Sequence, residues 1–400
     1  MSPSAPETFE YDELARNILA GRGYVHEHLG VPYRGYASGL VYTGLSTAFY
    51  ALGGAAGPDV LRLFQVVIAA ATTLAVAAIT TSLGGSRRAA LAAGLLVAVH
   101  PALVYYDVRK LHPLGLDALL FAALIVVFLS SRRPSAWACA AAGVLLGAGI
   151  LERLTLAVLF PLGVLRIAPD GPPRERARRI AVFVGAMLLT IAPWLLRNHL
   201  VLGAPRASTM APEYFYMGNV PPSLGSYHLP SGELTIDAAP AELRRQLSAA
   251  DEYGQARIFR EASREYLTSQ PTRFAFGLAR KLAYFWTWAP QTGVLYPASY
   301  RRAYLALYAA LCIAALLGAR RLWRLSPTSR RGLVWIAASC LAVSCLQAVF
   351  YIELRHRWAL EPLLVVLAVF ALPAIFAIRS EAPAEHSAGT ARRSDAGGPR

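Results

Sequence analysis

The chain has 400 residues, of which 56% are hydrophobic and 16% charged, and its mean hydropathy is +0.41. A soluble protein of this length carries about a quarter charged residues, so the composition excludes a soluble globular protein and indicates a polytopic membrane protein. The formal net charge of +15 lies mostly in short arginine clusters between apolar runs. Such clusters fit the positive-inside rule and attraction to anionic lipid, and they argue against nucleic acid as a partner.

The first 59 residues predict two helices that do not cross the membrane. Residues 10–20 have one apolar face and are followed by Gly21, a stop signal for a helix. Residues 38–53 form a glycine-bounded apolar run that is short for a span. If this run crossed the membrane, the charge pattern of every later loop would be reversed. We therefore expect it to lie along the outer surface.

Apolar runs in the rest of the chain predict nine membrane-spanning helices. Each run is long enough to cross a hydrocarbon core about 30 Å thick. The tail from residue 381 has no apolar periodicity and is predicted to be disordered. The nine predicted spans are 60–83, 89–106, 113–130, 136–151, 153–168, 180–196, 302–319, 332–351 and 358–378.

The connections between these helices fall into two alternating sets. Arginine-rich loops are expected in the cytoplasm, and the loops that hold most carboxylates, imidazoles and aromatic rings are expected on the outer face. This places the N-terminus outside. It requires either a further helix before this start, which we favour, or insertion of 60–83 as a reversed anchor. The predicted regions are a first outer loop, a six-helix membrane region, a large outer loop, a three-helix membrane region and a cytoplasmic tail, at 1–59, 60–196, 197–301, 302–378 and 379–400.

The large outer loop begins at PWLLRN (193–198), where an apolar run gives way to polar sequence. Within the loop, residues 272–288 are amphipathic and contain two tryptophans, which is typical of a helix lying at the membrane interface. The four cysteines of the chain all lie in apolar runs without paired or metal-ligand spacing. We therefore assign no disulfide and no metal site, and no cofactor is certain.

Six segments, taken in order and with their predicted sides, carry a family resemblance. They are EYDELARNILAGRGY (10–24), VHPALVYYDVRKLHPLGLDALLF (99–121), LERLTLAVLFP (151–161), PWLLRN…YMGN (193–219), REYLTSQPTRFAFGLARKLAYFW (264–286) and ELRHRWALEP (353–362). Over residues 7–375 the chain resembles the GT-C superfamily of polyprenyl-phosphate-sugar-dependent glycosyltransferases, nearest to the protein-mannosyltransferase and aminoarabinose-transferase branch. The resemblance implies an all-α bundle of nine or ten transmembrane helices with outer juxtamembrane helices. It also implies sugar transfer from a polyprenyl phosphate to a glycan, lipid or protein hydroxyl outside the cytoplasmic membrane.

Such a transfer needs a base for the acceptor hydroxyl and cations for the leaving phosphate. Glu7 is the first candidate for the base, because the resemblance implies an acidic residue four positions before Tyr11. Continuing the first helix backwards puts Glu7 in line with Tyr11 on the inward face, where burial raises the pKa of a carboxylate. Two alternatives stay open: a capping box from Ser4 to Glu7, and a shifted register that makes Glu10 or Asp12 the base.

Asp107, at the outer end of a predicted span, is the second catalytic candidate. The resemblance implies an acidic residue in this second outer loop, but His112 and Pro113 stand where it would align, so the sequence departs from the family pattern at this position. The alternative for Asp107 is a solvated carboxylate paired with Arg109 or Lys110.

Seven cations of the outer loops are candidates for binding the donor phosphate: Arg34, Lys110, Arg153, Arg197, Lys281, Arg355 and Arg357. Arg153 lies between apolar segments and needs a partner, for which Glu152 is expected. Arg355 and Arg357 precede the last span in a segment expected to be extended, which would turn both side chains the same way. The resemblance implies arginines beside the donor phosphates here, and the alternative is snorkelling to lipid headgroups. Further candidate substrate contacts are Tyr11, His112 and Asn219.

Two other classes of function stay open. One is a carrier that moves a lipid-linked saccharide between leaflets, although the sequence shows neither internal repeats nor paired broken helices. The other is a non-catalytic assembly protein that keeps a degenerate version of the fold. Sugar transfer that vanishes with Glu7→Gln would favour the enzyme, and lipid transport without transfer would favour the carrier.

Overall fold

A computed structural model of the protein describes residues 7–36, 38–130, 134–168, 170–289, 291 and 293–372. Within these residues the regular secondary structure is almost entirely helical, with one two-stranded antiparallel hairpin. The predicted all-α class is confirmed. The predicted disordered tail and the capping residue Ser4 lie outside the described residues.

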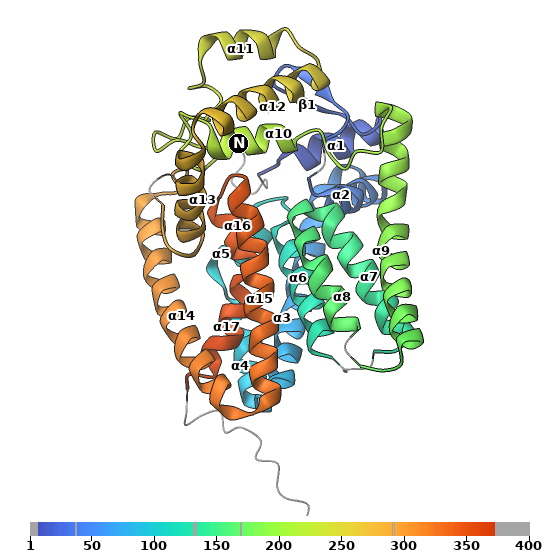
Figure 1. Cartoon of the computed structure of the whole chain (residues 1–400), viewed down its shortest axis with the longest axis vertical. Helices are drawn as coiled ribbons and strands as arrows, with labels where there is room; N and C mark the ends of the chain where they lie inside the picture. The colour runs from blue at the N-terminus through green and yellow to red at the C-terminus, as the bar shows by residue number, and fades with distance from the viewer. Residues whose placement is uncertain are drawn as a thin grey trace, which may run out of the picture.

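The long helices run along the longest axis of the molecule (Figure 1). Serine side chains cap several of them: the Ser86 and Ser135 hydroxyls accept from the amides of Ala89 and Ala138. The elements of this membrane body are α3 (Gly57–Ser82), α4 (Arg87–Ala98), α5 (Pro101–Arg109), α6 (Leu114–Leu129), α7 (Ala136–Glu152), the 3-10 helix η2 (Leu154–Leu159), α8 (Phe160–Ile167), α9 (Pro173–Leu202), α14 (Ala298–Leu325), α15 (Pro327–Val349) and α17 (Glu361–Val369).

Each of the nine predicted spans overlaps a helix or a broken helix of this body, and the part of the last span after residue 372 lies outside the described residues. By length and composition, four stretches of the described chain are able to cross a membrane: Leu40–Ser82, Pro173–Leu202, Ala298–Leu325 and Pro327–Val349. A fifth is added if α4 and α5 form one bent span. The integral membrane character is therefore supported, whereas the number of nine spans stays a prediction.

The predicted span 89–106 is not one straight helix, because it bends by 49° between α4 and α5. His100 at the bend has an extended backbone, with φ −63° and ψ 117°. Pro101 follows it and lacks the N–H that would continue the helix, and a proline also disfavours the helical conformation in the residue before it. The periodicity of apolar residues does not report this break.

Helices of the membrane body pack closely where glycine faces backbone. A Cβ at Gly143 of α7 would meet the carbonyl oxygen of Phe183 in α9 at 2.2 Å. A Cβ at Gly318 of α14 would meet the Leu367 carbonyl oxygen of α17 at 1.8 Å. Small residues at such contacts let helices approach closely without the bulk of side chains. Around these contacts, buried apolar side chains from α3, α6, α7, α15 and α17 form the largest hydrophobic core.

A polar layer of shorter elements covers one end of the body (Figure 1). The predicted first helix is α1, the apolar run 38–53 is α2, and the amphipathic segment 272–288 is α13. The elements of the layer are α1 (Glu10–Leu19), β1 (His26–His28), β2 (Val31–Tyr33), α2 (Leu40–Gly53), the 3-10 helix η1 (Gly54–Ala56), α10 (Ala211–Asn219), α11 (Ala241–Ser248), α12 (Glu252–Ser269), α13 (Pro271–Trp286) and α16 (Leu354–Trp358).

The junction between α2 and α3 is a tight turn. A Cβ at Gly57 would meet the Tyr50 Cα at 2.6 Å, so the start of α3 lies directly against the last turns of α2. Gly54 within this turn has φ +53°, a backbone conformation that glycine adopts without strain. α2 also packs against α1 and α7, and this holds the first helix of the polar layer against the membrane body.

Candidate active site

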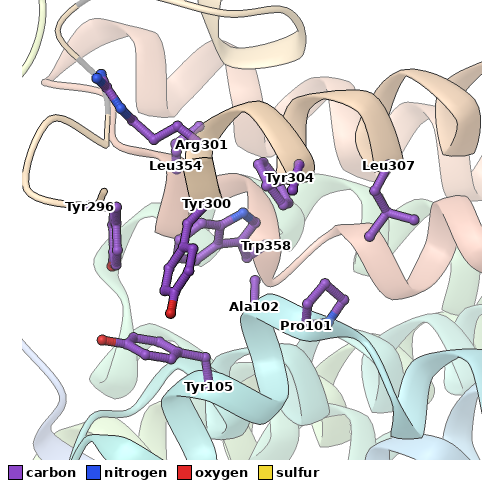
Figure 2. Close-up of a pocket in the computed structure, with 11 residues that line it drawn as sticks. Pro101, Ala102, Tyr105, Tyr296, Tyr300, Arg301, Tyr304, Leu307, Leu354 and Trp358 are labelled. Carbon is purple, nitrogen blue, oxygen red and sulfur yellow. The ribbon is translucent and has the colours of Figure 1, made fainter. Parts of the chain in front are cut away.

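Three adjoining cavities lie where the polar layer meets the membrane body. The first, which we call the apolar groove, has a volume of ≈ 390 Å³ and lies between α5, α14 and α16. Figure 2 shows the rings of Tyr105, Tyr300 and Trp358 around a common space, with Pro101 and Leu307 farther along the groove. Its walls are almost entirely aromatic and aliphatic, so the groove is suited to an apolar chain.

The second cavity, the Lys110 cavity, has a volume of ≈ 360 Å³ and shares Tyr105, Tyr296 and Trp358 with the groove. The Nζ atom of Lys110 lies 2.9 Å from the Glu7 carboxylate. It also lies 5.1–5.6 Å from the ring centroids of four aromatic residues. Such faces stabilise a cation. The rings belong to Phe9, Tyr105, Tyr106 and Tyr296.

Backbone pairing holds Glu7 opposite Lys110. The Glu7 amide donates to the Arg109 carbonyl, and the Leu111 amide donates to the Glu7 carbonyl, each at 2.9 Å. α1 begins only at Glu10, after an extended Phe9. The expectation that Glu7 continues the first helix is therefore wrong, because this short parallel bridge takes up its backbone groups. The Glu7 side chain is 52% exposed within the cavity.

The third cavity, the histidine cavity, has a volume of ≈ 220 Å³ and is lined by polar and aromatic side chains. His26 and His28 alternate along β1 and both face it, each with a carboxylate partner. His26 Nδ1 lies 2.7 Å from Glu13, and His28 Nε2 lies 2.8 Å from the buried Glu213. Glu10, a further lining residue, accepts a hydrogen bond from the Tyr36 hydroxyl at 3.0 Å.

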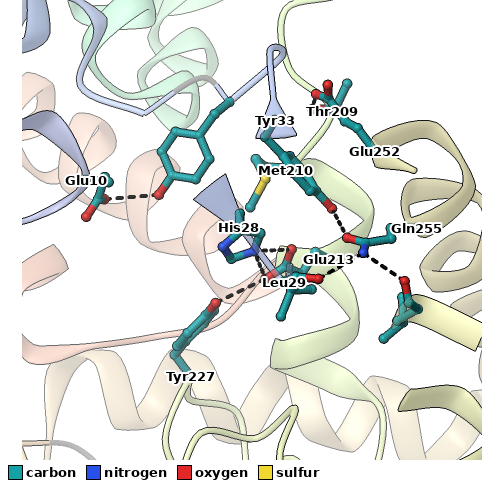
Figure 3. A network of polar contacts seen from close by, with 12 residues as sticks. Glu10, His28, Leu29, Tyr33, Thr209, Met210, Glu213, Tyr227, Glu252 and Gln255 are labelled. Atoms are coloured by element: carbon teal, nitrogen blue, oxygen red, sulfur yellow. Dashed lines mark hydrogen bonds and ion pairs between the residues drawn. The ribbon is translucent and has the colours of Figure 1, made fainter. Parts of the chain in front are cut away.

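Figure 3 shows the buried network behind His28, in which Glu213 also accepts from the Tyr227 hydroxyl at 3.0 Å. Burial by itself lowers the pKa of His28, but the hydrogen bond and the charge of Glu213 more than compensate and raise that pKa above its ordinary value. Two other imidazoles behave differently. Burial and the nearby arginines lower the pKa of His112 and of His356 well below the ordinary value, so both rings are neutral.

Arg355 borders both polar cavities. Within the described part of the chain no carboxylate lies within 4.0 Å of its guanidinium, so its charge is not neutralised by an ion pair. Arg357 behaves differently. It is 1% exposed, pairs with Glu361 at 3.0 Å and donates to two backbone carbonyls. The segment is the helical turn α16 and not extended, and residues two apart on a helix point in nearly opposite directions.

Arg153 lines the histidine cavity, but its partner is Asp117 and not Glu152. Arg153 follows the last turn of α7 with an extended backbone, φ −146° and ψ 105°, which turns its side chain away from its neighbour. The Glu152 carboxylate instead accepts from the Tyr42 amide at 2.9 Å and so holds the start of α2.

The structure thus brings together part of the predicted set. Glu7, Lys110 and Arg355 meet in one cavity, and Tyr11, His112 and Arg153 line the next, also beside Arg355. The other predicted residues lie elsewhere. Asp107 is buried against Gly115 and lines none of the three cavities, and Lys281 and Asn219 line a separate pocket at α13. Arg197 donates to the carbonyls of Arg34 and Tyr24, away from all three cavities.

Sequence reasoning missed both histidine–carboxylate pairs of the histidine cavity. The signal for His26 and His28 was the alternation HEH before Leu29-Gly30, which places two imidazoles on one face of a short strand. Nothing local indicated Glu213, because it lies 185 residues from His28. Within the described residues, no group of three or more His, Cys, Asp or Glu side chains is arranged to hold a metal ion.

The fold and these cavities describe a helical membrane protein with three adjoining cavities at the edge of its membrane body. Residues 39–196 match the family model of the dolichyl-phosphate-mannose-protein mannosyltransferases. This match confirms the predicted resemblance to the polyprenyl-phosphate-sugar-dependent glycosyltransferases.

Two solved structures of ArnT from Cupriavidus metallidurans are also similar to the chain. The structure bound to undecaprenyl phosphate has 19% sequence identity and a TM-score of 0.39, and the apo structure has 17% and 0.38. In both cases the similarity covers 89% of this chain and 72% of the other. A comparison with curated proteins found no match.

Proposed function

We propose that the protein is an integral membrane glycosyltransferase that moves a sugar from a polyprenyl-phosphate donor to a glycan, lipid or protein hydroxyl. The reaction would take place at the outer face of the cytoplasmic membrane. The observation that carries the proposal is the continuity of the three cavities, from an apolar groove through a chamber that holds Lys110 and Arg355 together with Glu7 and Glu353 to a polar one, with Arg355 bordering both chambers.

The donor fits this order of environments. Its prenyl chain would lie along the apolar groove, and its phosphate would enter the Lys110 cavity between Lys110 and Arg355. A guanidinium without an ion-pair partner is suited to this task, because charge-assisted hydrogen bonds to phosphate are strong. The sugar would extend past Arg355 into the histidine cavity, where Glu10, His28 and Tyr36 offer hydrogen bonds to its hydroxyls.

Glu7 is the proposed base. Its carboxylate lines the phosphate chamber and is half exposed, so an acceptor hydroxyl can reach it from the water side. A donor phosphate that pairs with the Lys110 ammonium would replace Glu7 as the ion-pair partner of that ammonium. The acceptor oxygen then bonds to C1 of the sugar as the bond from C1 to the phosphate oxygen breaks, with inversion. The acceptor proton passes to Glu7, and the electron pair of the broken bond stays on the polyprenyl phosphate.

Glu10 is the second candidate for the base, because it lines the histidine cavity and is oriented by Tyr36. Asp107 has no part in the proposed reaction, because its carboxylate lines none of the three cavities. Arg357 is assigned a structural role, because its N–H groups already donate to Glu361 and to backbone carbonyls.

The test is transfer from undecaprenyl-phosphate sugars, labelled in the sugar, to membrane glycolipids, with purified full-length protein. Glu7→Gln is expected to lower the turnover number by about 10²–10⁴-fold, the usual contribution of a positioned base. Arg355→Gln is expected to impair transfer by weakening the hold on the phosphate. The matched controls, Glu242→Gln and Arg245→Gln, remove the same charges from the exposed pair on α11 and should retain wild-type activity.

Four results would change the proposal. Full activity of Glu7→Gln with loss in Glu10→Gln would move the base to Glu10. Full activity of Arg355→Gln would remove that arginine from the phosphate site. Movement of the donor between leaflets without cleavage would indicate a carrier. Neither transfer nor transport, from donors across the common hexoses and pentoses, would indicate an assembly protein.

A further inference from the structure

We propose that a fourth cavity, the α13 pocket, binds the phosphate headgroup of an anionic membrane lipid. The pocket has a volume of ≈ 140 Å³ and lies where α13 meets the end of α10. It shares no lining residue with the groove, the Lys110 cavity or the histidine cavity. Its polar lining includes Asn219, Ser223, Arg273, Arg280 and Lys281.

The ionisable side chains that line the pocket and are described are basic or aromatic, and none is acidic. Two arginines and a lysine are among them. Among the described residues, Arg273 donates only to the neutral amide oxygen of Gln270, at 3.2 Å. Arg280 forms no hydrogen bond or ion pair with another described side chain. Such a concentration of unneutralised positive charge around a cavity attracts an anion and supplies several donors to it.

Lys281 adds a buried amine to this wall. The side chain is 1% exposed, and Nζ donates to the Asn219 amide oxygen and to the Phe350 carbonyl, both at 2.7 Å. Burial, and then the charge of Arg280, lower the pKa of Lys281 to about 7. A neutral amine has two N–H groups, and these two acceptors take both. An anion in the pocket would favour the ammonium, whose third N–H has no other acceptor in the described structure.

The surface around the pocket indicates a lipid as the source of the phosphate. Phe276 also lines the pocket and is 78% exposed, on the same amphipathic helix as the two arginines. Apolar side chains beside arginines on one helix are typical of a helix that lies at headgroup level. Phosphate oxygens are then expected among the arginines and acyl chains beside Phe276. A soluble phosphate would leave Phe276 uncovered.

The same contacts connect the pocket to the proposed active site. Phe350, whose carbonyl accepts from Lys281, directly precedes Tyr351 in the wall of the histidine cavity. A Cβ at Gly218 would meet the Phe350 carbonyl oxygen at 2.2 Å, so α10 lies directly against this turn. A headgroup that favours the charged form of Lys281 would strengthen the hydrogen bond from Nζ to the Phe350 carbonyl, and this would fix the position of Tyr351.

The test is photolabelling of the purified full-length protein in phosphatidylcholine vesicles that contain a photoreactive phosphatidylglycerol. Labelling is expected on α13, and Arg273→Gln/Arg280→Gln should weaken it by about 25-fold, since each basic residue near an anionic surface contributes roughly fivefold. The matched control Arg257→Gln/Arg260→Gln removes two exposed charges from α12 and should label like the wild type. Labelling of the α13 double variant at the wild-type level would overturn the proposal.

A second measurement does not depend on variants that could misfold. The chain contains two lysines, Lys110 and Lys281, so ¹³C-lysine NMR resolves each of them. At pH 7.5, near the pKa of Lys281, phosphatidylglycerol should shift the Lys281 signal toward the ammonium position. An equal shift with inorganic phosphate would overturn the assignment to lipid, and no shift with either would overturn the site. Neither experiment contains a sugar donor, so either can fail without affecting the proposed transferase.

Discussion

Two arginines two positions apart, Arg355 and Arg357, have opposite surroundings. Arg357 is enclosed by Glu361, Tyr304 and backbone carbonyls, whereas Arg355 faces two cavities without an ion-pair partner. A charge buried as deeply as that of Arg357 is tolerated only when it is paired and hydrogen-bonded. A guanidinium that lies beside a cavity and has no ion-pair partner is instead suited to binding an anionic ligand. The same residue type thus serves the fold at one position and is suited to binding at the other.

The titration of Lys281 is a test at this scale. With a pKa of about 7 in the folded protein, its ¹³C signal should have its midpoint near pH 7 in lipid-free detergent, and Lys110→Arg assigns the other signal. Between about 7 and the ordinary value of 10.5, the unfolded chain holds a proton that the folded protein has released. The free energy of unfolding should therefore rise with pH across this window. Lys281→Met should flatten that rise, and a midpoint near the ordinary lysine value would contradict the prediction.

The residue types of the site were predictable, but their pairing was not. The sequence indicated these residues separately: Glu7 from the resemblance, by its place four positions before Tyr11, and Lys110 and Arg355 as cations of the predicted outer loops. It did not indicate that Glu7 and Lys110 form one ion pair, because that pairing depends on a backbone bridge between segments about a hundred residues apart. Arg153 shows the same limit. Its neighbour Glu152 was expected as its ion-pair partner, but the partner is Asp117 from another helix.

At the scale of elements, apolar runs predicted where helices form and glycine contacts decide how closely they pack. Runs of apolar residues located every helix of the membrane body. The bend at Pro101 was not predicted, because an apolar run continues through it. The start of α17 was also not predicted, because this helix begins only at Glu361, after the turn α16. Helix ends and bends depend on single backbone positions, which contribute little to a pattern averaged over many residues.

The contact between α7 and α9 gives a prediction about packing. Gly143→Ala should destabilise the protein by about 1–3 kcal/mol, because its Cβ would meet the Phe183 carbonyl oxygen at 2.2 Å and force the helices apart. Gly185→Ala in α9 is the matched control. No atom lies within 4 Å of its Cβ, and alanine favours a helix by about 1 kcal/mol, so the change should be neutral or stabilising. Thermal unfolding in detergent compares the two variants, and equal midpoints would contradict the expected role of Gly143.

At the scale of the whole molecule, an apolar body carries its polar cavities at one end. The hairpin and α10 to α13 all lie at that end, and the turn between α14 and α15 lies at the other (Figure 1). The charge of the connections predicts that the cavity end is extracytoplasmic and the arginine-rich end cytoplasmic. This sidedness follows from charge alone and is independent of any single side-chain contact.

Cysteine labelling in intact cells tests the predicted orientation. Glu27→Cys on the hairpin and Arg330→Cys near the start of α15 are both exposed positions at opposite ends of the molecule. In a background without the four native cysteines, a membrane-impermeant maleimide should label position 27 in whole cells. It should label position 330 only after the cells are permeabilised. The reverse pattern would place the cavities in the cytoplasm and would rule out transfer at the outer face.

The hairpin is tied to parts of the chain that are made much later. Tyr33 donates to Gln255 at 2.7 Å, the Arg34 amide donates to Glu252 at 2.8 Å, and His28 pairs with Glu213. During synthesis these N-terminal groups therefore leave the ribosome about two hundred residues before their partners, while several membrane helices are being inserted between them. The wall of the histidine cavity is consequently one of the last parts of the protein to assemble, and a truncated nascent chain carries its hairpin with those hydrogen bonds unmade.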